Sequence, residues 1–329
     1  MTNAIKKCAV ITGIYGQDGS FLAEYLISLG YRVVGLVSKV RSEFSGLEQA
    51  EIIVTDISDS VAMQEVFHAI QPDECYHLAA AHHSSQQKTT TDFRAQMLRV
   101  NFLSTQAILD AILDKTPSCR FLGAGSSQMY TPQADVTIVD ENTAYRPSSY
   151  YGITKAASAQ LVSLLRRERQ LWGVTAILFN HESTRRRMEF LSRKITLAAA
   201  GIRWNADKTA SSPVGKLEIS DIFARVDWSA ATDFILAMHM SLQVDEPRDY
   251  VLASGKVHSV REMLGEAFQA LNLNWSDHVL AAKTPTAALR PCLQGNPQRA
   301  HNSLGWKPKK SFPDLIQEMV EHDLRSIVR

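Results

Sequence analysis

Residues 8–19 read CAVITGIYGQDG, and this stretch decides the fold prediction. Its first five residues are apolar or β-branched, which predicts a short buried strand. Glycines follow at Gly13, Gly16 and Gly19, and apolar side chains then recur at helical spacing over residues 21–29. A strand, a glycine-rich turn and a helix in this order predict the first unit of a sheet that binds a dinucleotide.

The glycine loop has a chemical reason as well as a structural one. Glycine is needed where the chain turns tightly, where the backbone approaches a pyrophosphate, and where a helix packs on a strand. The N-terminus of the following helix offers free N–H groups and a positive dipole end to the phosphates. We therefore predict cofactor contacts from the three glycines, Gln17 and Asp18. Three glycines also fit a plain turn, and the flanking strand and helix favour the dinucleotide.

The rest of the first 180 residues continues this alternation. Further strands are predicted at residues 32–37, 51–55, 74–78, 120–125 and 174–179, with helices between most of them, including 61–70 and 100–113. Buried strands interleaved with helices predict a doubly wound, Rossmann-like parallel sheet. After about residue 180, prolines punctuate shorter elements. We expect an NAD(P)-binding domain over 1–180 and mainly a smaller α/β substrate-binding lobe over 181–329, with interleaved boundaries.

Composition excludes several classes of protein. Among 329 residues, 45% are hydrophobic and 21% charged, which predicts a globular chain with a sizeable core. Lys+Arg is 35 against Asp+Glu 34, so no net charge attracts nucleic acid or a membrane surface. No apolar run approaches about 18 residues, the length of a membrane span. The scattered cysteines and the lack of room for a signal peptide before the first strand predict reduced thiols in a cytoplasmic protein.

The ends of the second and third strands carry further candidate cofactor contacts. Lys39 and Arg41 stand where an acidic residue would bind the 2′-hydroxyl of NAD. Two cations there suit the extra phosphate of NADP, although a solvated basic loop is the other interpretation and NAD stays an alternative. Asp56 and Ile57 follow the third strand; Asp56 either faces the adenine or caps a helix beginning near Ser58.

A candidate proton-transfer set stands in the second half of the sheet. Tyr151 and Lys155 are four residues apart, on one face of a helix if that segment is helical. A nearby cation lowers the pKa of a tyrosine, which makes the phenol an acid or base near neutral pH. Ser126 follows the strand at 120–125 and would complete the site at the carboxyl edge of the sheet. The spacing of Tyr151 and Lys155 alone also fits an ordinary amphipathic helix.

The order of these motifs resembles the extended short-chain dehydrogenase/reductase family, and within it the GDP-mannose 4,6-dehydratase group. Residues 13–19 are similar to that group's GITGQDG start, and residues 178–183, LFNHES, are similar to its most specific segment. Residues 185–186, 192–195, 227–228, 295–297 and 304–308 continue the resemblance over nearly the whole chain.

The resemblance implies an NAD(P)-dependent enzyme that removes hydride from C4 of the hexose of a nucleotide sugar, preferably a GDP-sugar, through a transient 4-keto sugar. Tyr151 would take the C4 hydroxyl proton, assisted by Ser126 and Lys155. It also implies cofactor contacts from Leu78, Ala79, Ala80, His181 and Arg186 and substrate contacts from His83, Ser126, Asn180, Lys194, Arg225 and Arg290. A homodimer or homotetramer is expected, because the run at 185–187 lies where the family packs subunits; a surface charge run is the alternative.

Gln128 departs from the group's pattern, which has a glutamate at this position. An amide cannot accept the C5 proton or act as an acid toward the C6 hydroxyl, and such a loss typically costs about 10²–10⁴-fold. We predict that C4 oxidation or reduction survives and that elimination of water is slow or absent, unless a water molecule or His83 substitutes. A 4-ketosugar reductase, a C4 epimerase and a non-catalytic NAD(P)-binding sensor are the alternatives.

The substrate loops depart from the pattern too. Arg225 stands one place before Val226, which replaces an arginine, and Arg290 lies in a shifted segment. His82 and His83 are adjacent, so their side chains diverge, and no third ligand stands at helical spacing. We predict no metal site and interpret the histidine pair as a polar loop lining the sugar pocket.

Overall fold

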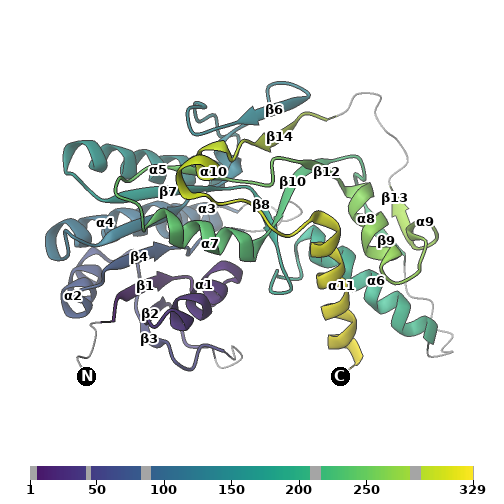
Figure 1. Cartoon of the computed structure of the whole chain (residues 1–329), viewed down its shortest axis with the longest axis horizontal. Coiled ribbons are helices and arrows are strands. Elements are labelled where there is room, and N and C mark those ends of the chain that lie inside the picture. The colour runs from purple at the N-terminus through teal and green to yellow at the C-terminus, as the bar shows by residue number, and fades with distance from the viewer. Residues whose placement is uncertain (1–5, 42–45, 83–89, 208–215, 282–289, 329) are drawn as a thin grey trace.

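A computed structural model describes residues 6–41, 46–82, 90–207, 216–281 and 290–328. Its centre is a seven-stranded sheet whose neighbouring strands are all parallel (Figure 1). In spatial order the strands are β11 (Tyr250–Leu252), β7 (Gly173–Leu178), β5 (Arg120–Ala124), β4 (Glu74–His77), β1 (Cys8–Thr12), β2 (Arg32–Val37) and β3 (Glu51–Val54). The strand order reverses between β1 and β4, which makes that point the topological switch of a Rossmann-like sheet.

Helices cover both faces of this sheet. One face packs against α1 (Gln17–Ser28), α7 (Ala231–Ser241) and α10 (Gln298–Leu304), and the other against α2 (Ser60–Ile70), α4 (Ser104–Lys115) and α5 (Tyr150–Glu168). The residues of β1 are buried throughout because both faces are covered. The predicted doubly wound sheet is therefore confirmed. All four cysteines are buried free thiols, as predicted.

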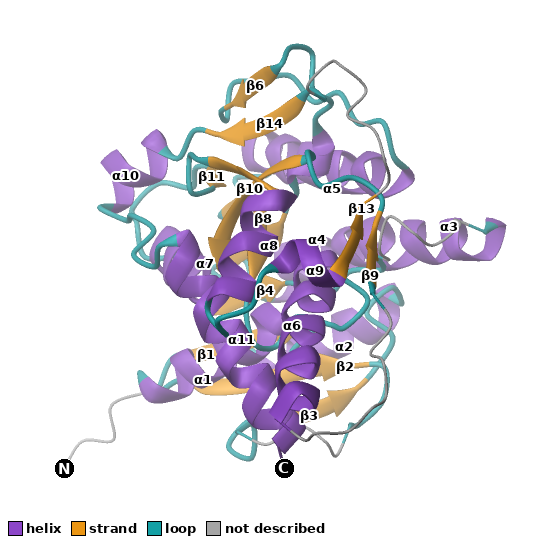
Figure 2. Ribbon diagram, turned by 90° about the vertical axis from the view of Figure 1, so that its right-hand side faces the viewer, coloured by secondary structure: helices purple, strands orange, loops and turns teal. Residues whose placement is uncertain are grey.

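A second lobe stands beside the sheet (Figures 1 and 2). Its core lies among α6 (Leu191–Asp207), α8 (Val260–Gln269), α9 (Trp275–His278), α11 (Phe312–Val328) and the short parallel pair β9 (Leu217–Ile219) and β13 (Val279–Ala281). Two of its helices, α6 and α11, have 17 residues each, longer than the proline pattern predicts. Pro313 does not interrupt α11, because proline is tolerated in the first turn of a helix.

Small sheets connect the two lobes. Strands β8 (Asn180–Glu182), β10 (Arg225–Ala230) and β12 (Val257–Ser259) form one, and β6 (Val136–Val139) pairs with β14 (Cys292–Gly295) in another. The chain also returns to the main sheet after residue 180, since β11 pairs with β7. The division into 1–180 and 181–329 stays a prediction.

Two helix boundaries differ from the sequence prediction. The cap of α2 is Asp59, which accepts hydrogen bonds from the N–H groups of Val61 and Ala62. Asp56 is not the cap, because its carboxylate closes a local turn on the N–H of Ser58 at 2.9 Å, before the helix begins. The helix predicted over 100–113 runs instead from α3 (Thr91–Leu98) through a π-helical turn, η1 (Arg99–Leu103), into α4.

Among the described residues, every helix is too short or too polar to cross a lipid bilayer. Over the same part of the chain, no group of three or more His, Cys, Asp or Glu side chains is arranged to hold a metal ion.

Candidate active site

The predicted site residues follow strands that end at one edge of the sheet. The glycine loop follows β1, residues 78–82 follow β4, Ser126 follows β5, and Asn180 follows β7. Because these strands are parallel, their carboxyl ends meet at the same edge, where ligands of open α/β sheets bind.

Packing explains two of the glycines in the loop. Gly13 has a left-handed backbone with φ of +73°, and a Cβ there would lie 2.8 Å from the backbone nitrogen of Ala79. A Cβ on Gly19 would collide with the carbonyl oxygen of Gly13. Gly16 caps α1 without a side-chain hydrogen bond. The first turn of α1 therefore presents backbone donors to a ligand, and the donor set fits the pyrophosphate of a dinucleotide.

Three predicted cofactor residues bind one another across this loop. His181 Nε2 lies 2.9 Å from Asp18 Oδ2, and Gln17 Nε2 donates to the His181 carbonyl at 3.1 Å. Burial disfavours the imidazolium, but the charge of Asp18 and its hydrogen bond outweigh burial and raise the pKa of His181. Burial likewise disfavours the carboxylate, yet the His181 charge prevails and lowers the pKa of Asp18. The first turn of α1 is thus tied to β8 by an ion pair.

The arginine run at 185–187 is engaged within the chain. Arg185 donates to Glu24 at 2.7 Å, and Arg186 Nε lies 3.1 Å from Glu182 Oε2. The Arg186 guanidinium also lies 3.8 Å from the centroid of the Phe190 ring. These contacts fold the segment back over the site.

Helix α5 carries the proton-transfer pair. Ser149 caps this helix, so Tyr151 lies in its first turn and Lys155 one turn later. The Lys155 ammonium donates to the Ala124 carbonyl at 2.8 Å and lies 5.8 Å from the centroid of the Tyr151 ring. A side-chain hydrogen bond joins Tyr151 to Ser126. The structure therefore brings Ser126, Tyr151 and Lys155 together.

The pKa of Tyr151 is raised in the structure, whereas the sequence predicted that it would be lowered. Burial raises this pKa to about 12, because the hydrogen bond from Ser126 and the positive charge of Arg186 offset only part of the desolvation. The predicted lowering by Lys155 is wrong in this structure. Burial also lowers the pKa of Lys155 itself to about 8, since desolvation disfavours the ammonium.

The sequence interpretation gave no role to two polar residues beneath the site. Asn101, in the π-helical turn, accepts from Ala81 N–H at 2.8 Å and donates to Thr154 Oγ1 at 3.1 Å. His77 is buried between Thr12 Oγ1 at 2.7 Å and Ser104 Oγ at 3.0 Å. Burial, assisted by the Lys155 charge, lowers the pKa of His77 to about 3. A polar residue inside an apolar run was the one available signal for each.

Gln128 has a neighbour that the sequence did not indicate. Its Nε2 lies 3.2 Å from His82 Nε2, and its Oε1 accepts from Ser149 Oγ at 3.1 Å. The His82 ring lies 4.3 Å from the Tyr151 ring, centroid to centroid. The predicted substrate contact was His83, which lies outside the described residues.

The backbone of Gln128 also fits closely against α5. A Cβ on Gly152 would collide with the Gln128 carbonyl oxygen, so glycine is required at that position.

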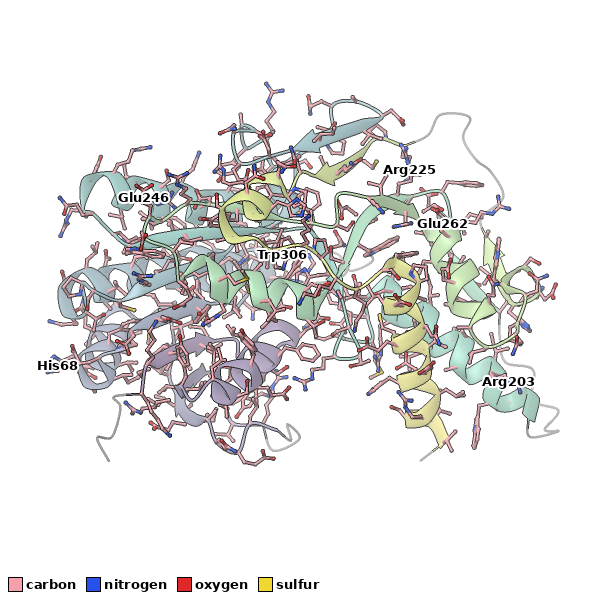
Figure 3. The ribbon with its side chains drawn as sticks, in the orientation of Figure 1. His68, Arg203, Arg225, Glu246, Glu262 and Trp306 are labelled. Atoms are coloured by element: carbon pink, nitrogen blue, oxygen red, sulfur yellow. The ribbon has the colours of Figure 1, made fainter. Side chains whose placement is uncertain are left out.

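The other predicted substrate-binding residues contact side chains outside this cluster. Arg225, which is labelled in Figure 3, donates to Asp135 Oδ1 at 2.6 Å and to the Arg290 carbonyl at 3.1 Å. Arg290 Nε lies 3.1 Å from Asp221 Oδ2, with 71% of its side chain exposed. A diphosphate would therefore compete with carboxylates for both arginines. Asn180 is exposed on β8, and Lys194 is half-buried in α6.

The contacts predicted for the adenosine end vary in exposure. Lys39 and Arg41 are exposed after β2. The Asp56 carboxylate lies 3.6 Å from Arg99 Nη1, and Ile57 packs partly buried against the core. Leu78 and Ala79 border the glycine loop, and Ala80 is exposed.

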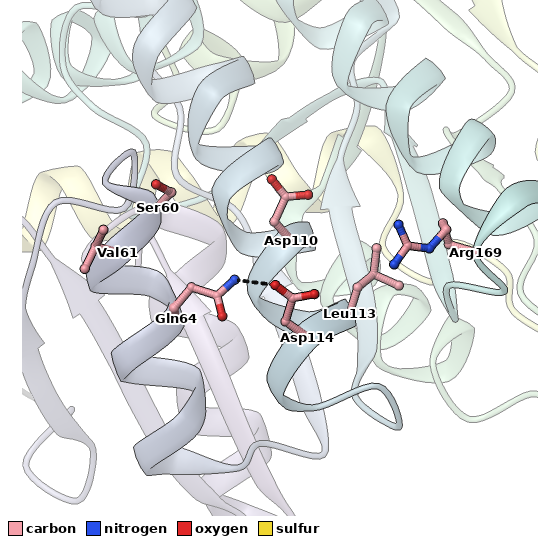
Figure 4. A pocket seen from close by; sticks show the side chains of 7 residues that line it. All are labelled: Ser60, Val61, Gln64, Asp110, Leu113, Asp114 and Arg169. Carbon is pink, nitrogen blue, oxygen red and sulfur yellow. Dashed lines mark hydrogen bonds between the residues drawn. The ribbon is translucent and has the colours of Figure 1, made fainter.

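A separate hollow of about 290 Å³ lies among α2, α4 and the end of α5 (Figure 4). Its walls are Ser60, Val61, Gln64, Asp110, Leu113, Asp114 and Arg169. A hydrogen bond of 3.1 Å joins Gln64 to Asp114 across it. None of the predicted site residues lines this hollow, so it is distinct from the candidate active site.

Solved structures share this fold over nearly their whole length. A UDP-glucose 4-epimerase with UDP-glucose from Thermotoga maritima superposes with a TM-score of 0.82 at 18% identity, covering 98% of this chain and 100% of its own. A dTDP-glucose 4,6-dehydratase from Bacillus anthracis in complex with NAD superposes with a TM-score of 0.80 at 16% identity, covering 96% of each chain.

Sequence relatives are closer. GDP-mannose 4,6 dehydratase 1 of Arabidopsis thaliana is 34% identical over 97% of this chain and 90% of its own. The GDP-mannose 4,6 dehydratase of Homo sapiens is 33% identical over 97% of this chain and 92% of its own. A family model described as GDP-mannose 4,6 dehydratase matches residues 10–319. The resemblance seen in the motifs is confirmed, and the chain belongs to the GDP-mannose 4,6-dehydratase family.

Proposed function

We propose that this protein is an NAD(P)-dependent enzyme that transfers hydride at C4 of the hexose of a nucleotide sugar. The observation that carries the proposal is the cluster of Ser126, Tyr151 and Lys155 beside the glycine loop. Nicotinamide, when bound, supplies the acceptor for the hydride. The glycines and the first turn of α1 would hold its pyrophosphate.

The residues of the chain supply the proton transfer. Ser126 Oγ accepts from Gln128 N–H at 3.1 Å, which leaves its own proton to donate to the Tyr151 oxygen. Tyr151 then exchanges a proton with the C4 hydroxyl of the sugar as hydride leaves or returns. Lys155 anchors the part of α5 that carries Tyr151, because its ammonium donates to the Ala124 carbonyl at 2.8 Å and lies 5.8 Å from the ring centroid. The positive charge that favours the phenolate comes from Arg186.

Gln128 determines which reaction follows C4 oxidation. Its carboxamide cannot take the C5 proton or protonate the departing C6 hydroxyl. We therefore propose reversible C4 oxidation and reduction with slow elimination of water, and a C4 reductase or epimerase as the second candidate. A GDP-sugar is favoured because the relatives are GDP-mannose 4,6 dehydratases.

NADP is favoured over NAD by the exposed cations Lys39 and Arg41 after β2. The proposed location is the cytoplasm, which the four free cysteines support.

Self-association into a dimer or tetramer is also proposed. Apolar side chains are exposed on neighbouring helices, at Leu98 (49%), Leu103 (41%), Ile153 (51%) and Leu164 (37%). Light scattering of the purified protein measures the mass directly, and a monomer at micromolar concentration would contradict this proposal.

The activity is tested by mixing the purified protein with NAD⁺ or NADP⁺ and GDP-, CDP- or UDP-sugars while following nicotinamide absorbance. Reduction of the cofactor with a GDP-hexose is the expected result. No change in nicotinamide absorbance with any of the sugars would favour a non-catalytic NAD(P)-binding sensor.

The Gln128 proposal is tested by comparing Gln128→Glu with wild type on GDP-mannose in deuterated water. A 4-keto-6-deoxy product with solvent deuterium at C5 should form about 10²–10⁴-fold faster in the variant, because its carboxyl group can protonate the departing C6 hydroxyl and the carboxamide cannot. Equal rates would show that the substitution is silent.

A further inference from the structure

His82 closes the side of the site on which Gln128 stands. Its ring lies 4.3 Å from the Tyr151 ring and stacks on Phe190 at 5.7 Å with an interplanar angle of 13°. Its carbonyl oxygen accepts from Arg187 Nη2 at 3.1 Å. The imidazole is therefore held between α5 and the segment before α6, next to the phenol that would act on the C4 oxygen.

The hydrogen bonds around Gln128 define which atoms face His82. Ser149 Oγ accepts from Gly152 N–H at 3.0 Å, so its proton is donated to Gln128 Oε1 at 3.1 Å. The carboxamide nitrogen is thereby turned toward His82 Nε2, at 3.2 Å. An amide N–H can only donate, so His82 Nε2 must carry a lone pair and the ring proton lies on Nδ1. Gln128 thus holds a neutral, basic imidazole.

We propose that His82 is the base that removes the proton from C5 of the 4-keto sugar, in place of the carboxylate that Gln128 lacks. This inference rests on the proposed function, because a ketone at C4 is what acidifies the C5 proton. The C5–H bond breaks and its proton bonds to the His82 Nε2 lone pair, which releases the hydrogen bond from Gln128 Nε2. The C5–H electron pair forms the C4–C5 double bond, and the C4 oxygen takes the negative charge. Tyr151 and Ser126 stabilise that oxyanion. Return of the proton from the imidazolium to C5 restores the ketone, so the exchange needs no oxidant.

The groups around His82 favour this role. Among the described residues, two charged side chains lie near it: Arg187 donates to its carbonyl oxygen at 3.1 Å, and the Arg186 guanidinium lies 3.8 Å from the centroid of the Phe190 ring. Both guanidinium groups lie over the Phe190 ring on which His82 stacks. Tyr151 is a titratable residue whose ring contacts His82, and burial raises the pKa of this phenol to about 12.

The carboxylates of the loop after Gln128 are engaged elsewhere. Asp135 binds Arg225 at 2.6 Å, and Asp140 accepts from Asn142 N–H at 2.9 Å. Glu141 accepts from Val251 N–H at 2.7 Å. Each of these three carboxylates therefore contributes to the fold of the loop, whereas His82 contacts the site.

The experiment supplies the ketone directly. Purified protein is incubated with GDP-4-keto-6-deoxymannose in deuterated water, and loss of the C5 proton signal is followed by NMR. Wild type should exchange this proton much faster than the same solution without protein. The exchange rate of His82→Gln should be at least about 10²-fold lower than that of wild type. The matched control is His68→Gln, an exposed histidine on α2 (Figure 3), which should exchange at the wild-type rate.

This design separates the inference from the proposed function, since exchange of a supplied ketone requires no hydride transfer. Failure of C4 oxidation with GDP-mannose would overturn the proposed function alone. Exchange by His82→Gln within about threefold of wild type, or no exchange by wild type, would overturn the role of His82.

A second variant distinguishes chemistry from a structural role. Adding Gln128→Glu to His82→Gln should restore exchange, because a carboxylate then occupies the neighbouring position. Imidazole added to His82→Gly should also restore the exchange. Pyrrole should not, because its nitrogen lone pair belongs to the aromatic ring system and is not basic. The inference would be overturned if pyrrole restored the exchange as well as imidazole does. It would also be overturned if neither added imidazole nor the Gln128→Glu carboxylate restored it.

Discussion

Two buried charged residues at opposite edges of the same sheet have very different surroundings. At the amino edge, Glu74 is 1% exposed and accepts from Tyr76 at 2.8 Å, Gln243 at 3.0 Å, Tyr31 at 3.1 Å and Lys7 at 3.2 Å. At the carboxyl edge, Lys155 is 3% exposed and donates to a backbone carbonyl.

The difference separates a structural charge from a reactive one. Four donors surround the carboxylate of Glu74, so its burial is compensated within the fold. Desolvation alone accounts for the lowered pKa of Lys155, and within the described part of the chain no ion pair offsets it. A buried charge that lacks a counter-charge is typical of reactive sites, which supports the proposed site at the carboxyl edge.

The largest expected effect comes from removing the phenol at the reactive edge. Tyr151→Phe should lower the rate of C4 hydride transfer to a GDP-hexose by about 10²–10⁴-fold, because the proton of the C4 hydroxyl loses its acceptor. Nicotinamide absorbance measures the rate. Tyr150→Phe is the matched control, since the neighbouring phenol is 50% exposed and contacts Arg94. An equal loss in both variants would contradict the assignment.

Lys155 should make stability depend on pH. Its pKa is about 8 in the folded chain against an ordinary 10.5, so between these values the unfolded chain binds more protons. The free energy of unfolding should therefore rise with pH by about 1.4 kcal/mol per unit, or about 3 kcal/mol across the window.

Urea unfolding of wild type and Lys155→Met at pH 8, 9 and 10 measures this slope, with the exposed Lys307→Met as control. The contribution should vanish in Lys155→Met and persist in Lys307→Met. A slope unchanged by Lys155→Met would show that the ammonium is solvated.

At the amino edge the effect should be smaller and confined to stability. Glu74→Gln replaces an acceptor by a donor facing other donors, and should lower the free energy of unfolding by about 1–3 kcal/mol. The rate per folded molecule should stay unchanged.

The control at this edge is Glu246→Gln, the same substitution in an exposed ion pair with Arg248, which should change stability by less than about 1 kcal/mol. If Glu74→Gln lowered the reaction rate without lowering the free energy of unfolding, Glu74 would not be a purely structural charge, and the proposed difference between the two edges would be wrong.

The local sequence pattern was enough to predict the sheet and the glycine loop, and it left open whether the segment that carries Tyr151 and Lys155 is helical. These features depend on short-range properties: apolar runs, glycine at tight approaches, and the spacing of side chains along one helix. Chain order then brings Ser126 to the same edge, because parallel strands end together.

Other features were decided only by contacts between distant segments. The pairing of Gln128 with His82 joins loops after two different strands, and Asn101 meets Ala81 through a π-helical turn that no local pattern indicates. The protonation of Tyr151 likewise depended on burial, which raised its pKa where spacing alone predicted a lowering. Sequence spacing places the charged and polar groups along the chain, whereas desolvation and partner choice arise only once segments far apart in sequence pack together.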